Sequence, residues 1–170
     1  MTRKVEVVPH NRHWQSLFTD ESQQLSIACG DNAIAIHHIG STAIETIYAK
    51  PIIDILIEVK DLNKVDDRNM AIESLGYIAM GEFGIPCRRF FRKDDNSGIR
   101  THHIHTFEVG LPQIARHLAF RDYLRSHPEA AQQYSQLKQK LAQQYPADIE
   151  GYMDGKAEFI KEIDNQASTL

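Results

Sequence analysis

The chain has 170 residues, of which 42% are hydrophobic and 25% are charged, as is typical of a soluble globular domain. Nineteen basic and 23 acidic residues give a net charge of −4, which argues against a general attraction to nucleic acid. No segment approaches the roughly 20 apolar residues of a membrane span, and the N-terminal segment has no signal-peptide pattern. We therefore expect a cytoplasmic protein that does not bind membranes.

Hydrophobic periodicity divides the first 110 residues into strands and helices. Short β-branched runs predict strands, and longer runs with apolar residues three or four positions apart predict helices. The run from Ile52 to Val59 is apolar on both faces, which is typical of a buried strand. In chain order we expect a strand at 5–8, a helix at 11–29, a strand at 33–39, a helical turn at 42–48, a strand at 52–59, a helix at 61–75, and strands at 77–80, 88–93 and 101–109.

After residue 110 the sequence predicts only helices. Helix starts and breaks are marked by Pro112, Pro128, Pro146 and Asp148. We interpret residues 1–170 as one α/β (α+β) domain, in which 1–110 form a mixed sheet flanked by helices and 111–170 form an all-helical region. No pattern in the helical region indicates chemistry.

Asp54 is a carboxylate inside an apolar strand. Side chains alternate across a strand, so Asp54 shares a face with Leu56 and Glu58. Glu58 lies about 13 Å further along, too far to ligate the same ion through a straight strand. Because a dry, isolated carboxylate is costly, Asp54 must meet a cation, N–H donors or open water. A functional role competes here with a simple ion pair near the strand end.

A Gly-Ser-Thr turn precedes this strand. Gly40 permits a close backbone approach, and the hydroxyls of Ser41 and Thr42 can cap the short helical turn that follows. Exposed N–H groups at such a turn favour an anion such as phosphate. The turn alone is equally typical of a plain helix cap, but its place between two strands, twelve residues before Asp54, favours a phosphate site.

Several segments together resemble the GrpB family of small bacterial proteins. They are HIGST…AKPIIDILIEV, RRFFRK, RTHHIHTFEVG and HLAFRDYLRSHPEAAQQYSQLKQKLAQQYP, and the resemblance extends from about Val7 to Ile163. A strand ending in Gly-Ser, a short helix and a strand with an acidic residue also resemble the DNA polymerase beta-type nucleotidyltransferase superfamily. The resemblance implies a nucleotidyltransferase-like fold, and therefore a mixed sheet flanked by helices.

The superfamily resemblance also implies roles for individual residues. Gly40 and Ser41 match the pair that contacts nucleotide phosphates, and Asp54 matches the first metal-binding carboxylate. The second carboxylate is expected two residues later, where this chain has Leu56. Leucine cannot ligate Mg²⁺, which prefers oxygen ligands, so the two-metal mechanism of phosphoryl transfer lacks a ligand here.

Histidines on a later strand are candidates to replace the missing ligand. His103 and His105 share one face of the strand at 101–109, and the superfamily's third carboxylate comes from a later strand of the same sheet. Imidazole favours Zn²⁺ or Mn²⁺ over Mg²⁺. His37 and His38 are further candidates. The competing interpretation is that these are hydrogen-bonded strand residues, and a histidine can also act as a general base or phosphate contact.

Basic residues offer contacts to an anion. Arg88 and Arg89 lie on a basic strand, and the planar guanidinium suits phosphate. Lys50 precedes the strand of Asp54 and is also placed to meet an anion. The competing interpretation of the basic strand is an exposed edge whose charges prevent aggregation.

Three functions remain open from the sequence. The first is a protein that binds a nucleotide or other phosphorylated small molecule with a divalent metal (Mg²⁺, Mn²⁺ or Zn²⁺), with nucleotidyl or phosphoryl transfer at Asp54 as the reaction if it is an enzyme. Gly40, Ser41, Thr42, Lys50, Arg88 and Arg89 would hold phosphate, and Asp54, His103 and His105 would hold the metal. The second is a non-catalytic binding module that has lost the metal site, and the third is a His/Asp transition-metal hydrolase. The sequence does not predict the oligomeric state.

Overall fold

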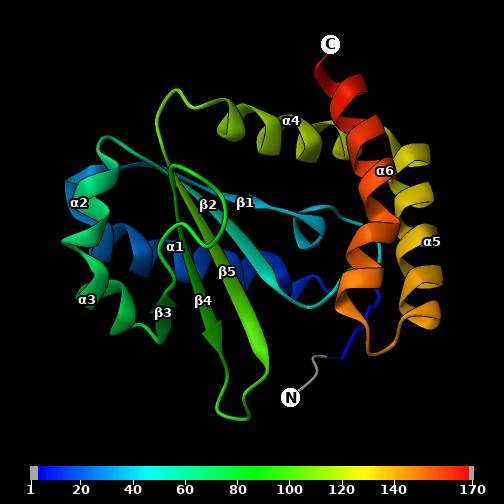
Figure 1. The fold of residues 1–170 in the computed structure, drawn as a ribbon, viewed down its shortest axis with the longest axis horizontal. Coiled ribbons are helices and arrows are strands. Elements are labelled where there is room, and N and C mark those ends of the chain that lie inside the picture. Colours follow the sequence, from blue (N-terminus) through cyan, green and yellow to red (C-terminus); the bar gives the residue numbers. More distant parts are fainter. Residues whose placement is uncertain (1–3, 169–170) are drawn as a thin grey trace.

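The computed structural model describes residues 4–168, and its centre is one mixed sheet (Figure 1). The strands are β1 (Ala33–Ile39), β2 (Ile53–Val59), β3 (Tyr77–Ala79), β4 (Arg88–Asp94) and β5 (Arg100–Glu108). Their order in the sheet is β1-β2-β5-β4-β3. β2 and β5 run parallel, and the other neighbours are antiparallel. The acidic strand and the histidine strand are therefore direct neighbours.

Helices lie on both faces of the sheet (Figure 1). They are α1 (His13–Cys29), α2 (Leu62–Asp66), α3 (Asn69–Glu73), α4 (Pro112–Ser126), α5 (Pro128–Gln144) and α6 (Ile149–Ser168). The helices α1, α2 and α3 pack on one face, while α4, α5 and α6 contact one another and form a bundle beside the other face. No helix within residues 4–168 has the length and hydropathy required to cross a bilayer.

The two faces of β2 carry different cores, as the alternation predicts. Ile53, Ile55 and Ile57 pack against α1 in the main hydrophobic core. Leu56, on the opposite face, is fully buried in a smaller cluster under Ile114 of α4. Burial of each of these side chains contributes on the order of 2 kcal/mol of stability. Asp54 lies on the Leu56 face, next to the first residue of β2, and is half-buried.

Three predicted elements differ from the structure. The predicted strand at 5–8 pairs through a single bridge, Val8 with Ala49, because no sheet strand lies beside it. The predicted helix at 61–75 is two short helices, α2 and α3, interrupted at residues 67–68. The predicted helical turn at 42–48 is limited to a 3-10 turn, Ser41–Ala43, after which Ile44 is extended.

Candidate functional site

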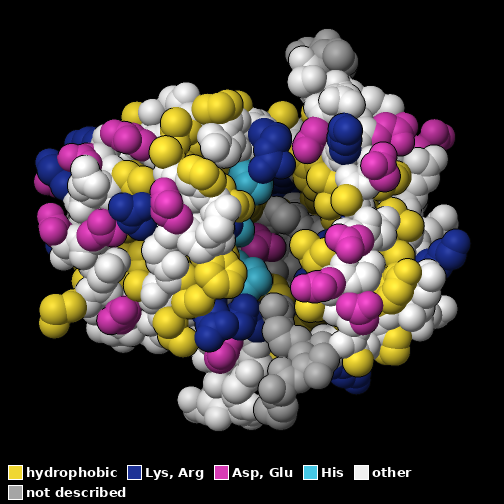
Figure 2. All heavy atoms as spheres, in the orientation of Figure 1, with side chains coloured by type: hydrophobic (Ala, Val, Ile, Leu, Met, Phe, Trp, Pro, Cys, Tyr) yellow, Lys and Arg dark blue, Asp and Glu magenta, His cyan; other side chains and the backbone are white. Residues whose placement is uncertain are grey.

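A cavity of about 340 Å³ lies between the sheet and the helices α4, α5 and α6. Figure 2 shows this hollow, with histidine and acidic side chains at its floor and basic side chains at its rim. The size suits a mononucleotide or smaller ligand. The polar lining residues are Ser41, Thr42, Lys50, Asp54, His103, His105, Arg116, His117, Tyr134, Lys138, Tyr152, Lys156 and Asp164.

The Gly-Ser-Thr turn and Asp54 meet at the sheet side of this cavity. Ile39, the last residue of β1, pairs with Asp54 of β2, so the chain leaves β1 at the level of the carboxylate. Gly40 has φ of 73°, and a Cβ atom there would lie 2.7 Å from Asp54 Oδ2. Glycine is required both for the left-handed backbone and for the close approach to the carboxylate.

Gly40→Ala is expected to lower the free energy of unfolding by about 2–3 kcal/mol, because the new Cβ meets Asp54 in a strained backbone conformation. Gly98→Ala is the matched control, since Gly98 also has positive φ but a Cβ atom there would meet no other atom within 4 Å. Denaturant unfolding of both variants isolates the contact with Asp54. If both variants lost the same free energy of unfolding, the predicted contact between a Cβ atom at residue 40 and Asp54 would be wrong.

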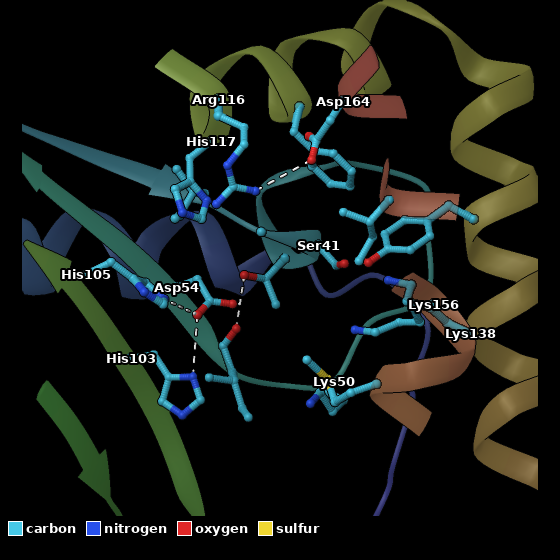
Figure 3. Close-up of a pocket in the computed structure, with 18 of the residues that line it drawn as sticks. Ser41, Lys50, Asp54, His103, His105, Arg116, His117, Lys138, Lys156 and Asp164 are labelled. Carbon is cyan, nitrogen blue, oxygen red and sulfur yellow. Dashed lines mark hydrogen bonds and ion pairs between the residues drawn. The ribbon is translucent and has the colours of Figure 1, made fainter. Parts of the chain in front are cut away.

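His103 and His105 meet at Asp54, as the shared strand face predicts. Asp54 pairs with His103 and Leu56 with His105 across β2 and β5. The distances to Asp54 Oδ1 are 3.5 Å from His103 Nδ1 and 3.3 Å from His105 Nε2 (Figure 3). Burial raises the pKa of Asp54, but the hydrogen bonds from the two imidazoles outweigh it and hold this pKa well below its ordinary value. Asp54 is therefore a fixed anion and a weak proton acceptor.

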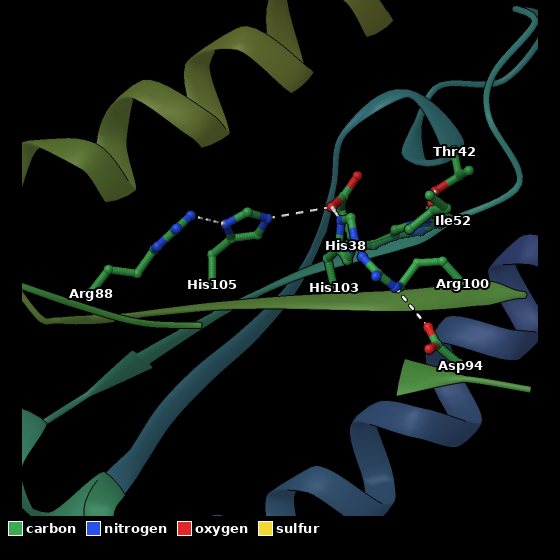
Figure 4. A network of polar contacts seen from close by, with 9 residues as sticks. His38, Thr42, Ile52, Arg88, Asp94, Arg100, His103 and His105 are labelled. Atoms are coloured by element: carbon green, nitrogen blue, oxygen red, sulfur yellow. Dashed lines mark hydrogen bonds and ion pairs between the residues drawn. The ribbon is translucent and has the colours of Figure 1, made fainter. Parts of the chain in front are cut away.

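An arginine contacts the far nitrogen of each imidazole (Figure 4). The distance from Arg88 to His105 Nδ1 is 3.2 Å, and from Arg100 to His103 Nε2 it is 3.0 Å. Guanidinium groups only donate hydrogen bonds, so both of these nitrogens are acceptors. It follows that the nitrogens facing Asp54 carry the protons. Burial, the largest effect, lowers the pKa of His103, in agreement with a neutral ring.

This donor set does not fit the divalent metal that the fold family implies. A metal needs an unprotonated ring nitrogen, whereas His103 and His105 present N–H groups to Asp54. Leu56, fully buried, occupies the place of the second carboxylate. No group of three His, Cys, Asp or Glu side chains within residues 4–168 has metal-binding geometry. The metal role of Asp54, His103 and His105 stays a prediction from the sequence.

Lysines of the helical bundle form the opposite wall of the cavity. Lys138 of α5 is only 1% exposed, and its Nζ atom has no hydrogen-bond partner among the described residues. Lys138 lies over the ring of Tyr134 and Lys156 of α6 over the ring of Tyr152. Figure 3 shows both lysines and Lys50 across the cavity from Asp54. The cavity is therefore strongly cationic on this side.

Burial changes the ionisation of Lys138 and Lys156. Burial, with smaller repulsion from Lys156 and Lys50, lowers the pKa of Lys138 to about 6. Burial and repulsion from Lys50 lower the pKa of Lys156 to about 8, although Asp54 opposes this change. An isolated buried lysine is costly unless an anion compensates it.

The predicted phosphate contacts are only partly brought together. Ser41 and Lys50 line the cavity, as predicted for phosphate contacts. Thr42 also lines it, but its hydroxyl donates to the carbonyl of Ile52 at 3.2 Å and accepts from His38 Nε2 at 2.9 Å. The Thr42 hydroxyl is thus occupied by bonds that hold the turn.

The two predicted arginines lie apart. Arg88 is buried behind His105 and does not line the cavity. Arg89, on the other face of β4, forms an ion pair with Asp66 at 2.8 Å and is remote from the site. Of the additional histidine candidates, His37 pairs with Glu58, and neither His37 nor His38 lines the cavity.

The model of the family described as GrpB protein matches residues 4–166. The chain belongs to the GrpB family. The protein YqkA of Bacillus subtilis is 47% identical over 165 residues, which are 97% of this chain and 48% of that relative. The chain thus spans about half the length of this relative.

Solved structures agree with the assignment to GrpB. The conserved protein GrpB from Enterococcus faecalis is 42% identical and superposes with a TM-score of 0.91, covering 95% of this chain and 96% of that one. Terminal uridylyl transferase 4 from Trypanosoma brucei, solved with bound dUTP, is 11% identical with a TM-score of 0.54 over 80% of this chain and 46% of that one. This second likeness concerns the fold alone, and it confirms the predicted nucleotidyltransferase-like fold of this GrpB chain.

Sequence reasoning missed the cationic wall of this GrpB chain, by which we mean the side of the cavity formed by Lys138 and Lys156. The helical region was expected to carry no chemistry, yet α5 and α6 supply Lys138 and Lys156. The signal was present, because each lysine follows a buried tyrosine by four residues and therefore shares its face: Lys138 follows Tyr134 and Lys156 follows Tyr152. A lysine on the buried face of an amphipathic helix indicates a buried ammonium that needs an anion.

Proposed function

We propose that this GrpB chain binds a nucleotide or another phosphorylated small molecule in the cavity, with the phosphate held by Lys138 and Lys156. The observation that carries the proposal is the buried amino group of Lys138, which has no hydrogen-bond partner among residues 4–168 and faces the cavity. A phosphate placed there would stabilise the protonated form of Lys138, which burial otherwise disfavours. Lys50 and Ser41 line the same cavity and would add contacts.

The other residues that line the cavity favour a ligand that has both a polar group and a planar ring. Phe120, Tyr134 and Tyr152 provide ring surface beside the lysines, and Asp54 provides a fixed acceptor on the other wall. Asp54 Oδ1 faces the histidines and Oδ2 approaches Gly40, and the carboxylate lines the cavity as an acceptor for a hydroxyl or amino group of the ligand. A phosphate ester that carries a hydroxyl-bearing or amino-bearing group matches this distribution.

Isothermal titration with adenosine and uridine mono- and triphosphates, in EDTA, tests the proposal. We expect saturable one-to-one binding of at least one phosphorylated compound and none of its dephosphorylated counterpart. Lys140→Met is a suitable control for Lys138→Met, because Lys140 is exposed and lies on the same helix, α5. Failure of every phosphate ester to bind would overturn the proposal.

Binding of a phosphate monoester is expected to weaken by at least about tenfold per pH unit between pH 7.5 and 9.0, because Lys138, and above pH 8 also Lys156, must gain a proton. In the free protein Lys138 has a pKa of about 6 and is neutral above it, so an anion must draw a proton onto it. The monoester itself is fully ionised in this range, since it titrates near pH ~6. The same titrations are carried out on Lys138→Arg, whose charge is fixed. The slope of log affinity against pH should be smaller in this variant by about one, which corresponds to one proton fewer taken up on binding. Identical slopes in the two proteins would contradict the role of Lys138.

Metal-dependent nucleotidyl or phosphoryl transfer, which the superfamily resemblance implies, stays a prediction for this chain. The cavity brings Asp54 next to the Gly40 turn, as that reaction requires, but without a second carboxylate at Leu56. Consumption of labelled nucleotides with Mg²⁺ or Mn²⁺, compared with binding in EDTA, distinguishes an enzyme from a binding module. Metal-dependent consumption would confirm the prediction of an enzyme, and binding without consumption would identify a binding module.

A further inference from the structure

We propose that Arg88 and Arg100 keep divalent metals out of this site by fixing His103 and His105 as hydrogen-bond donors to Asp54. Arg88 lies 3.2 Å from His105 Nδ1, and Arg100 lies 3.0 Å from His103 Nε2. Each imidazole therefore stands between a donor-only guanidinium and an acceptor-only carboxylate (Figure 4). The inference concerns the metal and does not depend on which ligand occupies the cavity.

The tautomers follow from this arrangement. His105 carries its proton on Nε2 and His103 carries its proton on Nδ1, because the opposite nitrogen accepts from an arginine. A histidine that ligates a metal has the reverse arrangement, since its second nitrogen normally donates to a carboxylate or carbonyl. Coordination by either ring would leave a guanidinium facing an N–H group, or would require the ring to lose both protons.

Both arginines are anchored, which makes their displacement costly. Arg88 is 5% exposed, donates to the carbonyls of Glu82 at 3.2 Å and Phe83 at 3.0 Å, and stacks on Phe90 with 4.6 Å to the ring centroid. Arg100 forms an ion pair with Asp94 at 2.7 Å. Removal of one partner from a buried charged hydrogen bond costs on the order of 2 kcal/mol or more. The same side chains that orient the histidines thus oppose metal entry.

Nitrogen-15 NMR of the wild-type imidazoles, assigned with His103→Gln and His105→Gln, tests the tautomers directly. We expect His103 to be neutral and protonated at Nδ1, and His105 to be neutral and protonated at Nε2. This measurement requires no arginine variant, so it remains decisive even where a variant fails to fold. The opposite tautomer at His103 would overturn the inference.

Equilibrium dialysis against Zn²⁺ and Mn²⁺ tests the exclusion itself. The wild type is expected to bind neither ion stoichiometrically at micromolar concentration at this site. Arg100→Met frees His103 to change tautomer, and we expect Zn²⁺ affinity to rise at least tenfold. The gain in Zn²⁺ affinity should disappear when Arg100→Met is combined with Asp54→Asn. This double variant distinguishes binding at Asp54 from binding at other histidines of the protein. Stoichiometric metal in the wild type that depends on Asp54, or no gain in Arg100→Met, would overturn the inference.

Discussion

Lys138→Met is expected to stabilise the unliganded protein and to reduce its affinity for a phosphate ester at least 100-fold. Lys138 is buried and its pKa is lowered to about 6, so the folded state disfavours the proton that the unfolded chain holds up to pH ~10.4. Methionine has a similar length and has no proton to lose on folding, so it avoids this cost. We expect a gain of about 3 kcal/mol near pH 7.

The pH dependence of this gain has a definite sign. Because the pKa of Lys138 is lower in the folded state, the unfolded state binds more protons between pH ~6 and ~10. The stability of the wild type therefore rises with pH through this window. The advantage of Lys138→Met should shrink as the pH rises and vanish near pH ~10.

Denaturant unfolding of Lys138→Met and Lys140→Met at pH 7 and 10 provides the measurement. Lys140 lies two residues away on α5 and is exposed, so its replacement should change stability by less than about 0.5 kcal/mol at either pH. A residue that destabilises the free fold and strengthens ligand binding serves function at the expense of stability. If Lys138→Met were less stable than the wild type at pH 7, the description of the cationic wall as an anion site would be wrong.

Asp54→Asn is expected to lower the free energy of unfolding at pH 7 by about 2 kcal/mol. The carboxylate lies 3.5 Å from His103 Nδ1 and 3.3 Å from His105 Nε2 and accepts their protons in hydrogen bonds, whereas a neutral amide oxygen accepts them less strongly. The pKa of Asp54 is lowered in the folded state, so its stabilisation is present above pH ~4 and is lost as the pH falls below this value.

Urea unfolding of Asp54→Asn and Asp66→Asn at several pH values measures this contribution. Asp66 pairs with Arg89 at the surface and is 46% exposed, so its loss should cost less than about 1 kcal/mol. The deficit of Asp54→Asn should decrease as the pH falls from 4 towards 2. Equal stability of the two variants at pH 7 would show that the imidazoles do not stabilise the carboxylate.

Local patterns predicted most of the fold. The alternation of Ile53, Ile55 and Ile57 with Leu56 places two cores on the two faces of β2, and the structure confirms both. Helix starts at Pro112 and Pro128 are also confirmed. The strand predicted at 5–8 was wrong, because strand formation depends on a neighbour that the local sequence does not specify. Long-range pairing decides such elements.

The parts of the candidate site that follow from strand alternation could be predicted from the sequence. The parts that depend on packing between distant segments could not. The alternation places His103 and His105 on one face, and the structure brings both to Asp54. The partners Arg88 and Arg100 could not be predicted, since their contacts depend on side-chain directions around the sheet. Lys138 was overlooked because a lysine in a helix is normally counted as solvent-exposed.

The ionisation of Lys138 tests the central claim most directly. NMR titration of protein labelled at lysine Cε carbons, with and without the phosphate ester identified by calorimetry, reports the pKa of each lysine. We predict one lysine with a pKa near 6, absent from Lys138→Met, whose pKa rises by at least two units when the ligand saturates the protein. A Lys138 resonance that titrates above pH ~9 in the free protein, or one that the ligand leaves unchanged, would contradict the account.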